Sequence, residues 1–223
     1  MSTSSPPQQI ERYQRLIAIS RDLASTLDLD LLLERIVNAA AELTNSEEAS
    51  ILLYDDRSSK LYFQAATNFD PRLRGLEIPA EKSLAGWIIQ TGEPVCVADA
   101  QRDERHFSPA SQVTGVTTHT LLGVPLRARQ KIIGVLEAIN KRQGEFTPDD
   151  QEILTTLGAH AAVAIENSRL FQQSDLIAEF IHEIRTPLAA LQTAIHLLQR
   201  TGMEAERFER LAGQMQKEIQ RLA

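Results

Sequence analysis

The fold of this chain is decided by residues 131–150, which read KIIGVLEAINKRQGEFTPDD. The apolar run that opens this stretch is typical of a buried strand and ends at Asn140 and Lys141. Thr147 can cap a helix, the proline after it suits the first helical position, and the next two acids favour the positive end of the helix dipole. We therefore predict a strand, then a helix from Thr147, tied together by a Lys141–Asp150 ion pair.

Further strands and a short helix precede this stretch. Apolar runs bounded by turn residues predict a hairpin over residues 49–67 and a strand over residues 118–130, which turns near Arg129 into the strand described above. Ser83 is expected to cap a short helix. The single cysteine, Cys96, falls in another short apolar strand and is expected to be buried. Helices flank these strands at both ends, so the sequence predicts an α+β fold.

The N-terminal region predicts a helix that pairs with another helix. Residues 1–9 are rich in Ser, Pro and Gln and are expected to be disordered. Residues 10–27 carry a narrow apolar seam in one heptad register. Asp28 or Asp30 is expected to cap the helix that follows. The seam consists of Ile10, Tyr13, Ile17, Ala24 and Leu27, with Ser20 at the sixth position.

The C-terminal region predicts a helical hairpin. The helix from Thr147 meets no strong stop before Thr201 and Gly202, so it is one long helix or two helices joined nearly end to end. Pro187 is expected to kink it, because proline lacks a backbone donor and its ring clashes with the preceding turn. A return helix is expected after Gly202. Two helices cannot bury both apolar stripes, so we expect a homodimer that forms a four-helix bundle. The seam of the first helix consists of Ile177, Ile181, Ile184, Leu188, Leu191, Ile195 and Leu198.

The composition excludes several classes of protein. The 223 residues include 23 Lys and Arg against 30 Asp and Glu, and the net charge of −7 argues against a general nucleic-acid binder. No apolar run is long enough for a transmembrane helix, and the N-terminus lacks the pattern of a signal peptide. One cysteine provides neither an intrachain disulfide nor a cysteine-rich metal site. We therefore expect a cytoplasmic protein with no membrane or nucleic-acid partner.

Two segments resemble known families. Residues 180–188 read FIHEIRTPL and resemble the H-box on the dimerisation and phosphoacceptor hairpin of two-component sensor histidine kinases. Residues 28–170 resemble a GAF domain, a small-ligand sensor module with a central antiparallel sheet and flanking helices. The residues that carry this second resemblance are 134–141, Phe146 and Asp150, with Gln151 where the cyclic-nucleotide-binding members have Glu.

The two resemblances imply a domain order. A signalling helix over residues 10–27 precedes the GAF sensor domain over residues 28–170. A truncated phosphoacceptor (HisKA) hairpin over residues 171–223 follows and dimerises. The chain stops inside the return helix, which predicts a piece of a longer protein.

The H-box resemblance also implies catalytic roles. His182 is the implied phosphoacceptor, whose ring nitrogen attacks the γ-phosphate of ATP held by a separate domain. Glu183 is the implied base and orienting partner of the imidazole. Thr186 is implied to orient the water that hydrolyses the phosphorylated partner. His182 and His196 both fall at heptad position b, off the seam, and only the residues that flank His182 distinguish the two.

The implied cofactors belong to a domain that this sequence lacks. ATP and Mg²⁺ are expected on an ATP-binding domain of the same protein, because no glycine-rich nucleotide cluster follows His182. No cofactor is expected in this chain itself. No metal site is expected either, since Thr186 stands where a zinc-protease motif has its second histidine. The ligand of the sensor domain stays open between a cyclic nucleotide, another small molecule and no ligand.

Three functions fit these observations. The first is the sensor and phosphoacceptor region of a cytosolic histidine kinase that transfers phosphate from His182 to an Asp of a response regulator. The second is a ligand-binding and dimerisation module without kinase activity. The third is a phosphotransfer protein that receives phosphate from a separate kinase. A following ATP-binding domain would favour the first.

Overall fold

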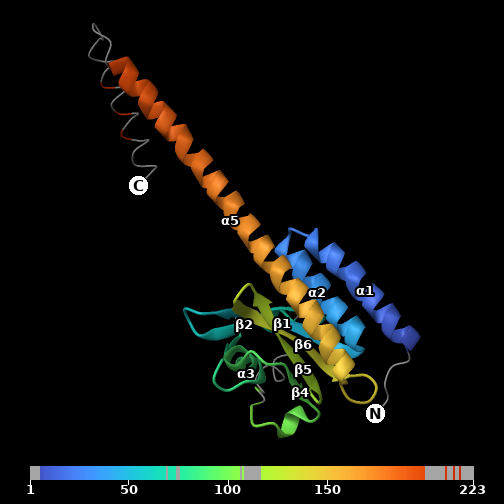
Figure 1. Cartoon of the computed structure of the whole chain (residues 1–223). Helices are drawn as coiled ribbons and strands as arrows, with labels where there is room; N and C mark the ends of the chain where they lie inside the picture. The colour runs from blue at the N-terminus through green and yellow to red at the C-terminus, as the bar shows by residue number, and fades with distance from the viewer. Residues whose placement is uncertain are drawn as a thin grey trace. The chain divides into compact units, whose positions relative to one another are not determined.

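A computed structural model of the chain describes residues 6–68, 70–73, 76–105, 107 and 117–198, together with residues 209, 213 and 216. The chain divides into two compact units, residues 1–169 and residues 170–223. The long helix α5 (Pro148–Leu198) contributes residues to both units (Figure 1).

The first unit is built on a six-stranded antiparallel sheet with the strand order β3-β2-β1-β6-β5-β4. Strand β6 follows β5 through a tight turn near Arg129, as predicted, and Arg129 has a positive φ of 55° there. Strands β1 and β6 lie at the centre and pair along most of their lengths. The strands are β1 (Ser46–Asp55), β2 (Lys60–Ala66), β3 (Glu77–Pro79), β4 (Val95–Val97), β5 (Leu121–Ala128) and β6 (Lys131–Lys141).

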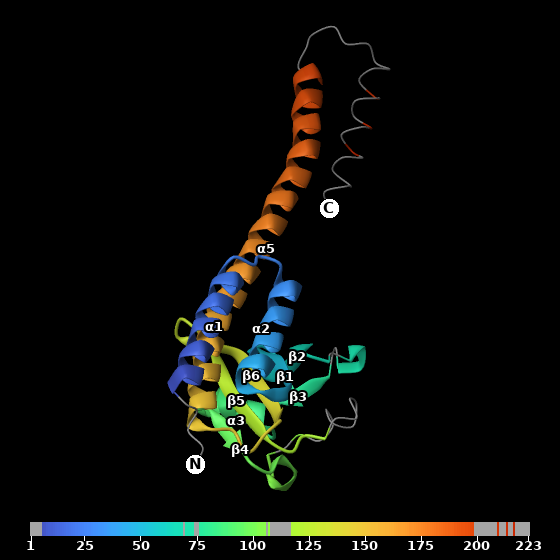
Figure 2. The same cartoon turned by 90° about the vertical axis from the view of Figure 1, so that its right-hand side faces the viewer.

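Helices cover both faces of this sheet. Helices α1 (Pro6–Ala24) and α2 (Leu29–Thr44) lie with the N-terminal part of α5 on one face (Figures 1 and 2). Helix α3 (Leu84–Thr91) packs on the opposite face. Because strand side chains alternate, Ile51 and Leu53 of β1 face the first set of helices and Leu52 faces α3. The predicted α+β fold with a central antiparallel sheet and flanking helices is therefore confirmed.

Capping residues mark the starts of α2 and α3. The Asp28 carboxylate accepts a hydrogen bond from the Leu31 amide at 2.8 Å, so Asp28 rather than Asp30 caps α2. The predicted cap of α3 is confirmed, since the Ser83 hydroxyl accepts from the Gly86 amide at 2.9 Å. A Cβ atom at Gly86 would lie 2.1 Å from a backbone oxygen, so only glycine fits at this position.

Helix α1 departs from the prediction in its start and in its buried face. It begins at Pro6, so the expected disorder over residues 1–9 is wrong for residues 6–9. Its Leu16 is buried with 2% exposure against the core that α2 and α5 share, whereas Ile17 of the predicted seam is 59% exposed. The helix carries two apolar stripes. Packing within the first unit mainly uses the stripe that contains Leu16 and Leu23, although Tyr13 of the predicted seam also packs against the core.

Helix α5 is one continuous helix of 51 residues through both Gly158 and Pro187. Of the two alternatives for this segment, the single long helix is correct. A Cβ atom at Gly158 would lie 3.2 Å from a methyl of Val124, so glycine lets α5 approach the sheet closely. The predicted return helix and four-helix bundle lie outside the described residues, apart from residues 209, 213 and 216, which are helical. In the described part of the chain, no helix has the length and apolarity needed to cross a membrane.

Candidate functional site

The first functional cluster surrounds Asp150 at the start of α5. Its carboxylate, only 1% exposed, accepts hydrogen bonds from Lys141 Nζ at 2.8 Å, from Arg12 Nη2 at 2.7 Å and from the Thr147 amide at 2.9 Å. In return, the Thr147 hydroxyl accepts from the Asp150 amide at 3.2 Å, which completes a capping box. The predicted Lys141–Asp150 pair is confirmed. Sequence reasoning missed Arg12, which lies far from Asp150 along the chain.

The electrostatics of this cluster favour the charged form of Asp150. Burial acts to raise the pKa of its carboxyl group, but the hydrogen bonds from Lys141, Thr147 and Arg12 outweigh burial and lower the pKa. The two cations also donate to the end of α2, Lys141 to the Thr44 carbonyl and Arg12 to the Leu43 carbonyl, each at 2.6 Å. One carboxylate therefore joins α1, α2, β6 and α5.

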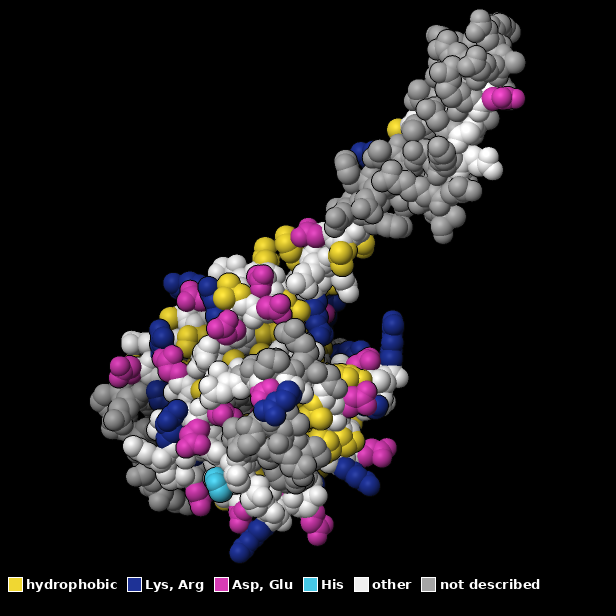
Figure 3. Space-filling model, turned by 180° about the vertical axis from the view of Figure 1, so that it is seen from behind, with side chains coloured by type: hydrophobic (Ala, Val, Ile, Leu, Met, Phe, Trp, Pro, Cys, Tyr) yellow, Lys and Arg dark blue, Asp and Glu magenta, His cyan; other side chains and the backbone are white. Residues whose placement is uncertain are grey.

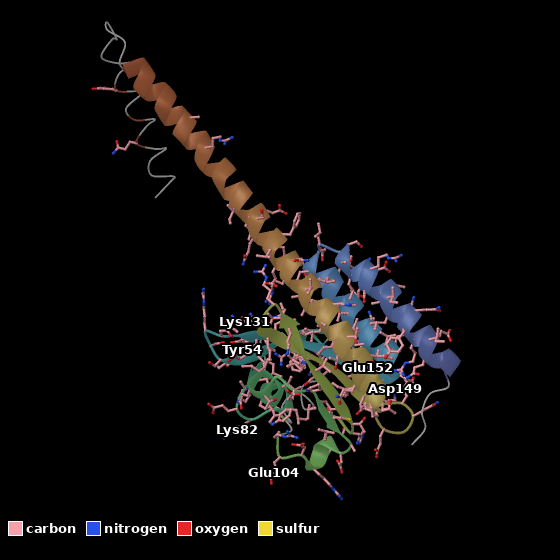
Figure 4. The ribbon with its side chains drawn as sticks, in the orientation of Figure 1. Tyr54, Lys82, Glu104, Lys131, Asp149 and Glu152 are labelled. Atoms are coloured by element: carbon pink, nitrogen blue, oxygen red, sulfur yellow. The ribbon has the colours of Figure 1, made fainter. Side chains whose placement is uncertain are left out.

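A second row of contacts holds α1 against α5. Asp149 and Glu152 lie on the first turns of α5 (Figure 4). Asp149 accepts a hydrogen bond from the Gln9 side chain at 3.0 Å. A hydrogen bond to Glu152 raises the pKa of the Tyr13 hydroxyl. The N-terminal helix is thus attached to the same turns of α5 that Asp150 caps.

Asn140 is a structural anchor at the end of β6. Its backbone has a positive φ of 56°, a conformation that asparagine tolerates better than most residues. Its side-chain oxygen accepts from the His119 amide at 2.7 Å, and its side-chain nitrogen donates to the Thr117 carbonyl at 3.0 Å and to Glu47 at 3.1 Å. Asn140 therefore fixes the chain that enters β5.

A pocket of about 70 Å³ lies on the face of the sheet opposite α1, α2 and α5, beneath the N-terminus of α3. Its wall is mostly apolar and has three polar side chains, Ser83, Thr118 and Glu137. The apolar lining consists of Leu52, Phe63, Ile78, Leu84, Ala85, Phe107, Leu121 and Ile139. A concave apolar site with a few polar groups is the usual form of a small-molecule site.

Glu137 is the unusual member of this pocket. It stands on β6 with 7% exposure, and the Ser50 hydroxyl donates to its Oε2 at 3.0 Å. Ser50 is the only hydrogen-bond partner of its carboxyl group among the residues that the structure describes. Burial raises the pKa of Glu137 to about 7, against the smaller opposing effect of the Ser50 hydrogen bond. Sequence reasoning missed this residue, although a single acid inside the apolar run of residues 132–139 was a usable signal.

The predicted phosphoacceptor residues lie on α5 in the second unit. The backbone of His182, Glu183 and Thr186 is helical, and their side chains lie outside the described residues. Of the neighbouring H-box residues, Arg185 is exposed. The roles of His182, Glu183 and Thr186 therefore stay predictions.

Two further sequence expectations concern metal and thiol chemistry. Cys96 is exposed, so the prediction of a buried cysteine is wrong. It lies on β4, a three-residue strand at the edge of the sheet, which pairs with β5 alone among the described strands. Partial burial raises the pKa of its thiol, which favours the unreactive protonated form. Within the described ranges, no three His, Cys, Asp or Glu side chains come together as possible metal ligands.

Comparison with known proteins places both units in families. The family model of the GAF domain matches residues 28–165, and that of the His Kinase A (phospho-acceptor) domain matches residues 172–223. The GAF domain of an Acinetobacter phosphoenolpyruvate-protein phosphotransferase is 25% identical, with a TM-score of 0.63 over 78% of this chain and 99% of that one. Free methionine-R-sulfoxide reductase from Neisseria meningitidis shares the fold at 22% identity and a TM-score of 0.62, over 76% of this chain and 96% of that one.

The curated relatives are longer proteins. The probable 3',5'-cyclic phosphodiesterase pde-5 of Caenorhabditis elegans is 25% identical over 181 residues, which are 74% of this chain and 25% of that protein. The dual 3',5'-cyclic-AMP and -GMP phosphodiesterase 11A of Takifugu rubripes is also 25% identical, over 92% of this chain and 25% of that protein. The chain thus spans about a quarter of the length of these relatives.

The burial of Glu137 predicts a pH-dependent cost to folding. Because its folded pKa of about 7 lies above the ordinary 4.5, stability is fully retained below about pH 4.5 and decreases as the pH rises through 7. Glu137→Gln removes this loss, so the variant should exceed the native chain in stability by up to about 3 kcal/mol near pH 8 and by little near pH 4.5.

Urea unfolding followed by the fluorescence of Trp87, the single tryptophan, measures this difference in the first unit. Glu34→Gln is the matched control, because Glu34 is exposed on α2. A gain in stability for Glu137→Gln that does not change with pH would contradict the ionisation argument.

Proposed function

Because the chain belongs to the GAF domain family and continues into a His Kinase A phosphoacceptor domain, we propose that it is the sensor and phosphoacceptor region of a two-component histidine kinase. The observation that carries this proposal is the order of the two domains along one helix. Helix α5 begins in the first unit at the Asp150 cluster and extends through the residues of the H-box. Both domains thus share one secondary-structure element.

The proposed chemistry is transfer of the γ-phosphoryl group of ATP to His182. A ring nitrogen of His182 forms the new bond to phosphorus, the bond from phosphorus to the bridging oxygen breaks, and ADP leaves. Glu183 accepts the proton that the imidazole loses. The phosphoryl group then passes to an Asp of a response regulator, and Thr186 orients the water that later removes it from that partner. An ATP-binding domain of the same protein supplies ATP and Mg²⁺.

The proposed active form is a homodimer in the cytoplasm, where ATP is available. Its support is a set of exposed apolar side chains on α1 and α5. Figure 3 shows hydrophobic side chains interspersed with acidic and basic groups on the face that it draws. A second copy would remove these side chains from water. The set includes Ile10, Ile17, Val163, Leu170, Phe171, Leu176 and Ile177.

The alternative is a GAF module that binds a small ligand and dimerises without kinase activity. The pocket beside Glu137 fits this function as well as the first. The two functions differ in whether His182 accepts phosphate.

Phosphoryl transfer is tested by supplying the chain with a histidine-kinase ATP-binding domain, Mg²⁺ and radiolabelled ATP. His182 should acquire an acid-labile, base-stable label, and His182→Gln should abolish it because an amide nitrogen is not nucleophilic. Glu183→Gln should slow labelling by about 10²-fold or more, because a general base contributes at this scale. Thr186→Ala should leave labelling nearly unchanged and slow only the loss of phosphate from the response regulator.

His196→Gln is the matched control, since His196 shares the heptad position of His182 but lacks its flanking residues. Label mapped to His196, or full labelling of the His182→Gln variant, would reject the assignment and favour the binding module.

The dimer is tested by sedimentation equilibrium. Leu191→Asp places a charge in the seam of the second unit and should raise the dimer dissociation constant by tenfold or more, since an unpaired charge is costly to bury. Ala189→Asp adds the same charge at an exposed position outside the seam and should change it little. A native chain that sediments as a monomer at micromolar concentration would refute the proposed dimer.

A further inference from the structure

The pocket beside Glu137 carries a prediction about the chemistry of its ligand. We propose that this pocket binds a small organic cation, an ammonium group on a short apolar body, with Glu137 as the counter-ion. This inference rests on the proposed sensor role of the first unit and gives that role a class of ligand. The sequence had left open whether the ligand is a cyclic nucleotide, another small molecule or absent.

The wall of the pocket selects an apolar body of limited size. Eight of its lining side chains are apolar, and they come from the sheet, from α3 and from Phe107. Burying a hydrocarbon group against them is favourable in proportion to the apolar area removed from water. The volume of about 70 Å³ suits an aliphatic group of a few carbons.

Among the polar groups that line the pocket, Glu137 is the charged acceptor that can receive a donor from a ligand. The Ser83 hydroxyl is already engaged, since it accepts from the Gly86 amide and donates to the Pro79 carbonyl at 2.8 Å. The Glu137 carboxyl has one oxygen bonded to Ser50, and its other oxygen has no hydrogen-bond partner among the described residues. That second oxygen is not fully enclosed, because within the described residues every fully buried side-chain oxygen has a partner. Glu137 therefore has one oxygen that a ligand can reach.

The charge of the pocket selects a cation. Glu137 is the single ionisable side chain among the described residues that line it, and no Lys, Arg or His of that lining compensates a negative charge. A buried carboxylate without a counter-ion is costly, so a bound ammonium gains both a charge-assisted hydrogen bond and relief of that cost. Two aromatic rings in the lining, Phe63 and Phe107, are also compatible with a cation.

The same charge disfavours the other classes of ligand. An anion such as a cyclic nucleotide would bring a phosphate toward the acid of the pocket and find no basic side chain in its described lining. A neutral alcohol would fill the apolar part but leave the carboxylate without a counter-ion. Because the pocket combines an acid with an apolar wall, it should bind an amine more tightly than an alcohol of the same shape.

Isobutylamine and isobutyl alcohol test this distinction because they share a hydrocarbon body and differ in charge. Each is titrated into the full 223-residue chain at about pH 8.5, where Glu137 is ionised and an alkylammonium with a pKa near 10.4 is still charged. The chemical shifts of the Ile78 and Ile139 methyl groups, which line the pocket, report binding there. The methyl of Ile36, buried on the other face of the sheet, is the internal control.

The amine should bind at least tenfold more tightly than the alcohol. Glu137→Gln should weaken the amine at least tenfold and leave the alcohol unchanged, whereas Glu34→Gln should affect neither. At about pH 5.5, where Glu137 is protonated and no other ionisable group of the described residues lines the pocket, amine binding should weaken by tenfold or more.

Two results would overturn the inference directly: equal affinity for the amine and the alcohol, or amine binding that survives Glu137→Gln. It would also be overturned if the methyl chemical shifts of Ile78 and Ile139 did not change up to about 50 mM amine, a concentration that reaches even weak binding by so small a molecule. Each of these results leaves phosphoryl transfer to His182 untouched. The labelling assay decides that function separately, so failure of the ligand class and failure of the proposed function are distinguishable.

Discussion

The buried carboxylate of Asp150 is the constraint on which the rest of the first unit depends. A charge with 1% exposure is stable only when it is paired, and Lys141 of β6 and Arg12 of α1 supply the partners. The same two cations reach the last carbonyls of α2, so four elements meet at one negative charge. Asp150 also closes the capping box with Thr147 that starts α5. The position at which α5 begins is therefore set by electrostatics as well as by apolar packing.

The central strands connect this cluster to the pocket. Because side chains alternate along β6, Leu136 and Ala138 pack into the core beneath the helices, while Glu137 between them faces the pocket. The same strand then ends at Lys141, which binds Asp150. A single strand thus carries the acid of the pocket on one face and, at its end, the cation that pairs with Asp150 of α5. The pocket and the layer of α1, α2 and α5 thus lie on opposite faces of the same sheet.

The sequence predicted those features that local patterns determine. Caps, turns and the Lys141–Asp150 pair were accessible because the residues concerned lie close together along the chain. The contact of Arg12 with Asp150 could not be predicted from the sequence, because it joins the two ends of the first unit and depends on the packing of α1. The prediction of the buried face of α1 was wrong for a related reason. The helix has two apolar stripes, and the elements that pack against it decide which one is buried. The acid at position 137 stood out within its apolar run, but its contact with Ser50 could not be predicted, because that contact depends on the pairing of β1 with β6. The roles of the H-box residues were predicted from their short sequence motif, and the structure of the first unit does not test them.

The most direct test of this account is the free energy of unfolding of Asp150→Asn, compared with that of its neighbour Asp149→Asn. Urea unfolding followed by Trp87 fluorescence measures both in the first unit. Asp150→Asn leaves the charges of Lys141 and Arg12 without their partner, so it should lower the free energy of unfolding by about 3–5 kcal/mol. Asp149→Asn keeps an oxygen that can accept from Gln9 and removes only the charge from this contact, so it should cost less than about 1 kcal/mol. Equal small losses for the two variants would contradict the central role of Asp150.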